Sequence, residues 1–240
     1  MSSKSNAMIY VPSYHRSNAI KTYHLLEKCV YVVRKSEEKA YLNAGIKKED
    51  LWAVDDELIN GGDVVVWYII EHAKEDAIVI CDDDFDDFRY MLDFTYDCGK
   101  DKETITAELE RILQLVVDLD IGLGFLSPTC IPYNYDREIA FKGIPGAVKF
   151  INRKVFKAKY DEKVAENFDM DMVLQELMYN RICIMPKYFY DKSKMDVNAG
   201  GNSERVRQQQ IDSVMNMKAK WGKYFDYNWK SNKPNIKVER

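Results

Sequence analysis

Cysteine, histidine and proline are all scarce in this chain. Its 240 residues include five cysteines, three histidines and six prolines. The cysteines show neither close pairing nor metal-site spacing, so we expect no disulfide framework and no zinc site. No apolar run approaches the ~18 residues that cross a bilayer, and residues 1–7 lack the apolar stretch of a signal peptide. We therefore expect a cytoplasmic protein, in which residues 1–7 are a disordered start or a leftover of cloning.

The chain is slightly acidic as a whole and basic at one end. The net charge of −4 argues weakly against broad nucleic-acid binding. In residues 218–240, cations are interleaved with aromatic rings: Lys218, Lys220, Trp221, Lys223, Tyr224, Phe225, Tyr227, Trp229, Lys230, Lys233, Lys237 and Arg240. This composition is typical of a segment that binds single-stranded or splayed nucleic acid. It is equally typical of a terminal segment whose rings dock on the core while its lysines face solvent.

Strand and helix signals alternate through the first hundred residues, which predicts an α/β fold. Crossovers of this length join parallel strands in one doubly wound sheet. We expect strands at 8–11, 29–33, 51–54 and 77–81, with helices at 18–27, 36–45 and 64–73. Later elements are helices at 104–119, 168–179 and 204–218 and short strands at 121–125, 139–141, 147–151 and 182–185. The pattern predicts a mostly parallel sheet flanked by helices, with a small mixed second lobe.

The strand at 77–81 ends at three consecutive carboxylates, Asp82, Asp83 and Asp84. A run that is apolar at every position indicates a strand covered on both faces. Asp82 and Asp84 lie two residues apart, so in an extended segment their side chains point the same way. Two hard oxygen ligands on one side suit Mg²⁺ or Mn²⁺ carrying the phosphates of a substrate. An acidic cap that merely sits in solvent is the weaker interpretation, because the triplet follows a buried strand.

Two more polar clusters follow predicted strands and could hold a nucleotide. Pro12, Ser13, Tyr14 and Arg16 come directly after the first strand. Backbone groups, the Ser13 hydroxyl and stacking on Tyr14 suit a base and a ribose there. Arg34 follows the second strand, where a lone arginine is commonly just solvated. We include all five residues in the candidate nucleotide site, together with Asp82 and Asp83.

An acidic cluster, Glu166, Asp169 and Asp171, lies at the start of a predicted helix. An aspartate there is a common helix cap, but the same location can present a carboxylate to a substrate as general base. Asp169 is the first choice for that base, Glu166 is the next, and Asp171 completes the candidate catalytic set. A second loop, at Gly200 and Gly201, has unobstructed N–H groups for an anion, although an ordinary mobile loop is the default interpretation.

With these clusters assembled, the chain resembles the nucleotide-sugar glycosyltransferases of the GT-A fold. The order is similar: a Pro-Ser strand end, an arginine after the second strand, a helix led by Gly-Gly, then an apolar strand ending in an Asp-x-Asp motif. A closer resemblance is to the TET/JBP-associated glycosyltransferases, which include the base J glucosyltransferase and phage relatives. It covers roughly residues 8–95 and is carried by 31–34, 41–45, Gly61-Gly62, 81–85 and Phe88-Arg89.

The resemblance implies a metal-dependent enzyme that moves a sugar from a nucleotide-sugar donor, expected to be a UDP-sugar, to a hydroxyl acceptor. Asp82 and Asp84 would bind Mn²⁺ or Mg²⁺ at the donor diphosphate, and a later acid would act on the acceptor. The expected acceptor is a hydroxymethylated pyrimidine in phage DNA, reached through the basic tail, which would place the enzyme in the host cytoplasm. The implied organisation is one GT-A-like domain at 8–217, with a nucleotide-binding half at 8–95 and an acceptor half at 96–217, followed by a basic aromatic tail at 218–240.

Three alternatives stay open. The acceptor could be a polysaccharide or a protein. A nucleotidyltransferase shares the sheet and the metal carboxylates, but it generally has a glycine-rich loop after the first strand, and Pro12-Ser13-Tyr14 contains no glycine. A non-enzymatic nucleic-acid-binding module would leave the acidic triplet unexplained, because carboxylates without a metal repel phosphates. Retaining and inverting chemistry are both open, and only the inverting reaction requires a base such as Asp169.

Overall fold

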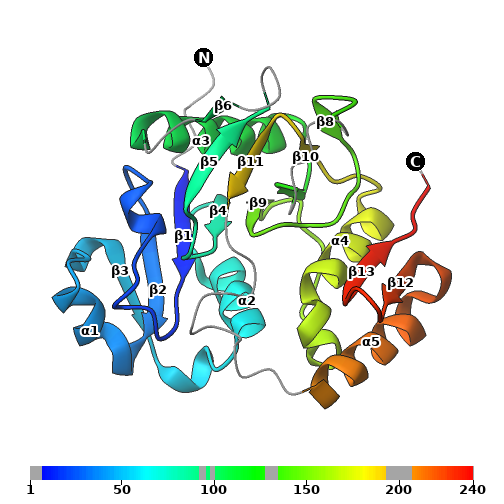
Figure 1. Ribbon diagram of the computed structural model, residues 1–240, viewed down its shortest axis with the longest axis horizontal. Coiled ribbons are helices and arrows are strands. Elements are labelled where there is room, and N and C mark those ends of the chain that lie inside the picture. Colours follow the sequence, from blue (N-terminus) through cyan, green and yellow to red (C-terminus); the bar gives the residue numbers. More distant parts are fainter. Residues whose placement is uncertain (1–6, 92–95, 98–100, 128–134, 193–206, 240) are drawn as a thin grey trace.

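The computed structural model describes residues 7–91, 96–97, 101–127, 135–192 and 207–239. Its centre is a six-stranded sheet in the order β3-β2-β1-β4-β9-β7 (Figure 1). The strands are β1 Met8–Pro12, β2 Val30–Arg34, β3 Leu51–Val54, β4 Ala77–Cys81, β7 Leu123–Phe125 and β9 Val148–Asn152. The first four of these strands are mutually parallel, whereas β9 pairs antiparallel with both β4 and β7. The predicted mostly parallel sheet is confirmed.

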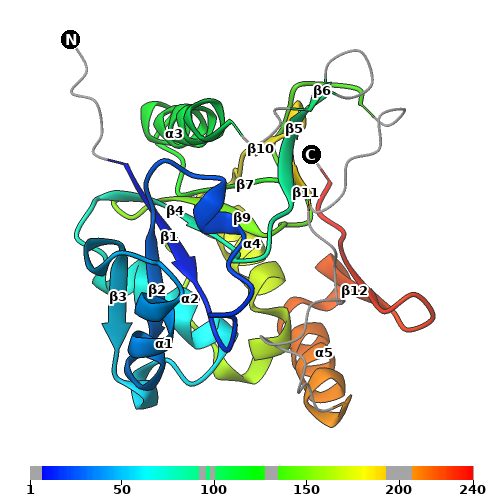
Figure 2. The same ribbon diagram turned by 60° about the vertical axis from the view of Figure 1, so that its left-hand side comes forward.

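Helices cover both faces of this sheet. These helices are α1 Glu38–Asn43, α2 Gly62–His72, α3 Lys102–Asp118 and α4 Phe168–Tyr179. A fifth helix, α5 Arg207–Trp221, packs against α4 in a separate core. Within β4, Val79 and Cys81 belong to a core shared with α3, while Ile78 and Ile80 belong to a core shared with α2 and α4. Figure 2 shows α3 on one side of the sheet and α4 on the other. A strand buried on both faces must be apolar at every position, which explains the sequence of β4.

Smaller antiparallel sheets form the mixed second lobe that the sequence predicts. One contains β5 Asp87–Tyr90, β6 Tyr96–Asp97 and β11 Phe189–Lys192, in the order β11-β5-β6. The other pairs β8 Ile139–Ala140 with β10 Met185–Pro186. The backbone N–H of Asp86 donates to the carbonyl of Lys192 at 2.8 Å. The end of β11 is therefore attached to the turn that follows β4.

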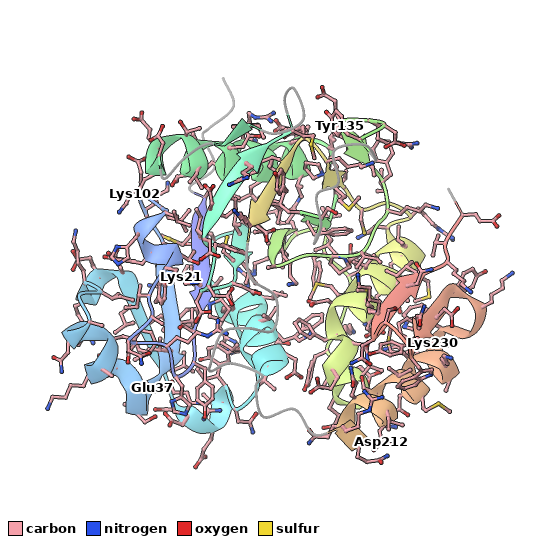
Figure 3. The ribbon with its side chains drawn as sticks, in the orientation of Figure 1. Lys21, Glu37, Lys102, Tyr135, Asp212 and Lys230 are labelled. Carbon is pink, nitrogen blue, oxygen red and sulfur yellow. The ribbon has the colours of Figure 1, made fainter. Side chains whose placement is uncertain are left out.

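The C-terminal part is a folded unit on α4. After α5, the strands β12 Phe225–Asn228 and β13 Lys233–Ile236 form a hairpin. A third apolar core joins this unit to α4 and contains Val164, Met170, Leu174, Val214, Met217, Phe225 and Tyr227. The boundary predicted between 217 and 218 falls inside α5. The expected docking of aromatic rings is found for Phe225 and Tyr227, whereas Lys230 and Asp212 lie at the outer edge of the molecule (Figure 3).

The helix expected at 18–27 is wrong, because only the 3₁₀ turn Thr22–His24 forms there. The Thr22 N–H donates to the carbonyl of Asp83 at 3.3 Å, and its hydroxyl donates to the carbonyl of Asp82 at 2.8 Å. The polar groups of Thr22 thus form hydrogen bonds with the residues that follow β4 instead of forming a helix. These bonds join residues far apart in the chain, so the local sequence does not encode them.

The remaining local structure is mostly short. Further 3₁₀ helices lie at Lys35–Glu37, Lys48–Asp50, Asp56–Leu58, Glu162–Asn167 and Gly222–Tyr224. Cys29, Cys81 and Cys183 are free thiols buried in the core, where cysteine packs as a small apolar residue. In the parts of the chain that the structure describes, no helix combines the length and the apolar character needed to cross a membrane.

Candidate functional site

The acidic triplet leaves the sheet at the end of β4, and Asp82 is its first member. The backbone N–H of Asp82 donates to the carbonyl of Ala147 at 3.2 Å, and its own carbonyl accepts the Thr22 hydroxyl. The side chain reaches solvent, yet so much protein surrounds it that burial raises its pKa to about 7. The positive charge of Lys149 opposes that rise only in part.

Asp83 points the other way and serves the scaffold. Its carboxylate accepts short hydrogen bonds from the Ser13 hydroxyl and from Nη1 of Arg16, and only 6% of the residue is exposed. The Ser13 oxygen also lies 2.7 Å from the Tyr41 hydroxyl. Burial raises the pKa of Asp83, although Arg16 and Ser13 favour its ionised form. These contacts join the end of β1 to the end of β4, and they occupy the hydroxyl of Ser13 that the sequence assigned to a nucleotide.

Asp84 shares its cation with Asp83. Nη1 of Arg16 lies 3.1 Å from Oδ2 of Asp84, so this single guanidinium nitrogen bridges the two carboxylates. The pKa of Arg16 is raised, because the charges of Asp83 and Asp84 outweigh the opposing effect of burial. Nε of Arg16 is buried and has no hydrogen-bond partner. The structure therefore brings Arg16, Asp83 and Asp84 together, and it leaves one donor of the guanidinium unsatisfied.

Lys149 is a functional candidate that the sequence analysis missed. It lies opposite Ile80 in the pairing of β9 with β4, so it shares the face of the sheet from which Asp82 emerges. The lysine is only 4% exposed, and its Nζ lies 3.0 Å from Oδ1 of Asp169 at the start of α4. Burial lowers its pKa, but the carboxylates of Asp169 and Asp82 raise it further, and the net direction is up. The available signal was a single lysine inside an apolar strand.

Asp191 is a second candidate that the sequence did not reveal. It lies on β11, opposite Phe88 of β5, and its Oδ1 is buried without a hydrogen-bond partner. Burial raises its pKa to about 6, an effect that the nearby charge of Lys149 opposes and that of Asp84 reinforces. Its nearness to the triplet depends on the long-range pairing of β11 with β5, which local sequence patterns do not encode.

Tyr14 and Arg34 form a separate platform after β1 and β2. The guanidinium carbon of Arg34 lies 4.2 Å from the centre of the Tyr14 ring, and Nε of Arg34 donates to the carbonyl of Ile59 at 3.3 Å. Pro12 is the last residue of β1. The predicted arginine is thus held in place by a ring and a carbonyl, an arrangement unlike that of a freely solvated side chain.

The other predicted residues lie elsewhere. Asp171 is 2% exposed and accepts hydrogen bonds from Nε1 of Trp221 at 2.7 Å and from Lys220 at 3.0 Å, so it ties α5 to α4. Glu166 is half-buried in the 3₁₀ helix that precedes α4. Gly200 and Gly201 lie outside the described residues.

The residues at the end of β4 fit a divalent cation of the kind that binds phosphates. Within the described ranges, no three His, Cys, Asp or Glu side chains form a ready-made metal cage. Mg²⁺ and Mn²⁺ need no such cage, because they commonly take one or two carboxylates and complete their shell with substrate phosphates and water. Asp82 and Asp84 are carboxylates of this kind and could serve as such ligands, and the unsatisfied Nε of Arg16 is a donor suited to an anion.

The sheet order and the attached small sheet give this domain a GT-A-like fold, which solved glycosyltransferases share. The chain is similar to a mannosyltransferase from Pyrobaculum calidifontis in complex with GDP-Man and Mn²⁺, with a TM-score of 0.59 and 14% identity over 92% of this chain. It spans 66% of that mannosyltransferase chain. No protein-family model and no curated protein matches the sequence.

Two further solved structures have the same arrangement. Glucosyl-3-phosphoglycerate synthase from Mycobacterium tuberculosis, in complex with Mg²⁺ and UDP, gives a TM-score of 0.54 at 8% identity and covers 97% of this chain and 87% of its own. Mannosyl-3-phosphoglycerate synthase from Rubrobacter xylanophilus gives a TM-score of 0.54 at 10% identity and covers 98% and 87%. At such low identities, the similarity establishes the fold.

Proposed function

We propose that this protein is a metal-dependent glycosyltransferase that moves a sugar from a nucleotide-sugar donor to a hydroxyl acceptor. One observation carries the proposal: Asp82 and Asp84 end a buried strand of a GT-A-like sheet, and the Lys149–Asp169 pair lies on the same face as Asp82. Proteins similar in fold were solved with GDP-Man and Mn²⁺ or with UDP and Mg²⁺, which supports a nucleotide sugar as the donor.

The donor would bind along the ends of β1, β2 and β4. Asp82 and Asp84 would hold Mn²⁺ or Mg²⁺, which when bound neutralises charge on the leaving diphosphate. Arg16 lies beside Asp84 and can donate to a phosphate oxygen. The platform of Tyr14 and Arg34 would stack against the nucleotide base. The strands β2, β1 and β4 are adjacent and parallel, so their carboxyl ends lie at the same edge of the sheet, where one donor could reach all of these residues.

We propose Asp169 as the general base of an inverting reaction. The acceptor hydroxyl loses its proton to the Asp169 carboxylate and its oxygen bonds to the anomeric carbon. The bond from that carbon to the diphosphate breaks, and the electron pair leaves with the diphosphate. Lys149 holds Oδ1 of Asp169 at 3.0 Å, and Asp169 is 34% exposed, so the base is fixed yet accessible to an acceptor.

The finer proposal for the acceptor is a hydroxymethylated pyrimidine in DNA. It is supported by the sequence resemblance and by the C-terminal unit, where Trp229 between β12 and β13 is 40% exposed and Tyr224 just before β12 is 46% exposed. Arg207 lies 5.8 Å from the Trp229 ring and Lys223 lies 5.3 Å from the Tyr224 ring. Exposed rings flanked by cations suit nucleic acid whose bases are splayed or flipped.

Turnover of candidate donors tests the transferase proposal. The full chain is incubated with Mn²⁺ and a panel of UDP- and GDP-sugars, and release of nucleoside diphosphate is measured. Asp84→Asn should abolish metal-dependent release, whereas the matched Asp86→Asn, in an aspartate that pairs with Lys21 at 2.8 Å, should retain it. Absence of metal-dependent donor binding and of release with every donor would refute the proposal.

A second measurement tests the base and the acceptor. Asp169→Asn should lower turnover by about 10²–10⁴-fold with donor affinity unchanged, and near-full turnover would rule out this base. Hydroxymethylated DNA, unmodified DNA, a polysaccharide and a protein mixture are then offered with the active donor, and product masses are read. A hexose or pentose mass gain confined to hydroxymethylated DNA supports the DNA acceptor, and a gain elsewhere overturns it.

A further inference from the structure

Arg16 occupies an unusual position for a residue next to a metal-binding carboxylate. Its Nη1 contacts Asp83 and lies 3.1 Å from Asp84, the carboxylate to which the proposed function assigns a metal. The guanidinium is largely enclosed, since 14% of the side chain is exposed. A fixed cation at this distance from a metal ligand must affect the affinity for a second cation.

The two contacts of Arg16 differ in how firmly they are held. Asp83 is buried and also accepts from Ser13, so breaking its contact with Arg16 would leave a buried charge without its cation. Asp84 is more accessible, with 18% of its side chain exposed. The contact with Asp84 is therefore the one that can be exchanged, while Asp83 keeps the guanidinium close by.

The unsatisfied Nε of Arg16 points to what would replace that contact. A buried N–H without an acceptor is unfavourable. A small rotation of the guanidinium that keeps its contact with Asp83 would therefore be stabilising if it brought Nε to an acceptor. An oxygen of a diphosphate is such an acceptor, and charge-assisted pairs of this kind are among the stronger hydrogen bonds.

We propose, on the basis of the function proposed above, that Arg16 is a built-in competitor of the metal, which exchanges its contact with Asp84 for the donor diphosphate. Free metal then binds weakly, because it must displace or repel the guanidinium. Nucleotide diphosphate relieves that conflict by giving Arg16 another partner. The site thus couples metal binding to donor binding, and linkage requires the coupling to be reciprocal.

Direct metal titration tests this proposal without using activity. Binding of Mn²⁺ to the full chain is followed by the paramagnetic resonance of free Mn²⁺, with and without UDP or GDP. Arg16→Gln should bind Mn²⁺ alone about tenfold more tightly, because the change removes the repulsion between the guanidinium and the doubly charged metal in partly aqueous surroundings. It should bind the nucleotide diphosphate about tenfold more weakly, so the part of the cooperativity that Arg16 contributes should disappear, while the direct attraction between metal and diphosphate remains.

The matched control is Lys21→Gln. Lys21 pairs with Asp86 at 2.8 Å, so this change removes one positive charge from the same acidic segment without touching the triplet. Its Mn²⁺ affinity should stay within about twofold of that of the unaltered protein. An equal gain in both variants would mean that general charge, and not the contact of Arg16 with Asp84, controls the site, and the proposal would be wrong.

The other outcomes are also decisive. If the unaltered protein binds no Mn²⁺ with or without nucleotide, the proposed function itself fails. If it binds Mn²⁺ and Arg16→Gln binds no more tightly, only the role of Arg16 is overturned. Should Arg16→Gln fail to fold, the double variant Arg16→Gln with Asp83→Asn replaces the buried pair by neutral amides. It should still bind Mn²⁺ alone at least threefold more tightly, because the competing contact is gone, and unchanged affinity would refute the proposal.

Discussion

Replacing Asp82 with asparagine should remove a pH dependence of stability from this protein. In the folded chain the pKa of Asp82 is raised from 3.8 to about 7, with burial as the main cause. Between about pH 4 and pH 7 the folded protein therefore holds a proton that the unfolded chain releases. The stability that goes with this proton is fully present below about pH 4 and is lost as the pH rises through 7. The Asp82→Asn protein has no carboxyl group to titrate there.

The size of the effect follows from the shift and from the exposure of the carboxylate. A shift of roughly three pKa units corresponds to about 4 kcal/mol at most. Because the side chain reaches solvent, screening reduces this to about 1–2 kcal/mol. We expect the free energy of unfolding of the asparagine variant to exceed that of the unaltered protein by this amount at pH 8, with no difference near pH 4.

Urea denaturation across this range measures the difference directly. Asp191→Asn is a useful comparison. Burial raises the pKa of the Asp191 carboxyl to about 6, so the pH dependence of stability that this variant removes should lie about one pH unit lower than that of Asp82. Saturating Mg²⁺ should stabilise the unaltered protein at pH 8 more than the Asp82 variant, since a bound cation favours the ionised carboxylate. Parallel pH profiles for the unaltered and Asp82→Asn proteins would show that the raised pKa is not a property of the folded chain.

Three other substitutions have definite expectations. Thr22→Val removes a hydroxyl that donates to the Asp82 carbonyl at 2.8 Å, and should cost about 1–3 kcal/mol in urea denaturation. Asp171→Ala should cost about 3 kcal/mol and shift the fluorescence of Trp221 to longer wavelength as α5 loosens, because Nε1 of Trp221 donates to Asp171. Tyr14→Ala should weaken nucleotide binding in calorimetry by about tenfold or more by removing a stacking ring, with thermal stability almost unchanged.

The elements with a strong local pattern were predictable from the sequence. The strand at 51–54 and the helix at 168–179 have the expected bounds, because each is a short apolar or amphipathic run with clear ends. The helix at 18–27 does not form, since Thr22 bonds to residues some sixty positions away. Tertiary contacts decided that segment, and a local pattern could not reveal them.

The residues of the candidate site also fall into two groups, those that the local sequence predicts and those that only long-range pairing brings near. Asp82 and Asp84 follow directly from the apolar run before them, so their position at a strand end was predictable. Lys149 and Asp191 approach the triplet only because β9 pairs with β4 and β11 pairs with β5. Asp171 looked like a catalytic candidate because it is an acid at a helix start, and only the structure shows that its partners are Lys220 and Trp221.

The antiparallel position of β9 beside β4 has a consequence for folding. The strands β1 to β4 come from the first third of the chain and can pair as soon as they are synthesised, but β9 begins only at residue 148. Until then one edge of β4, apolar at all five positions, has no partner strand. Exposed apolar edges recruit strands from other chains. A fragment that stops before residue 148 should therefore aggregate, and slow arrival of β9 should be the step at which a chaperone helps this protein most.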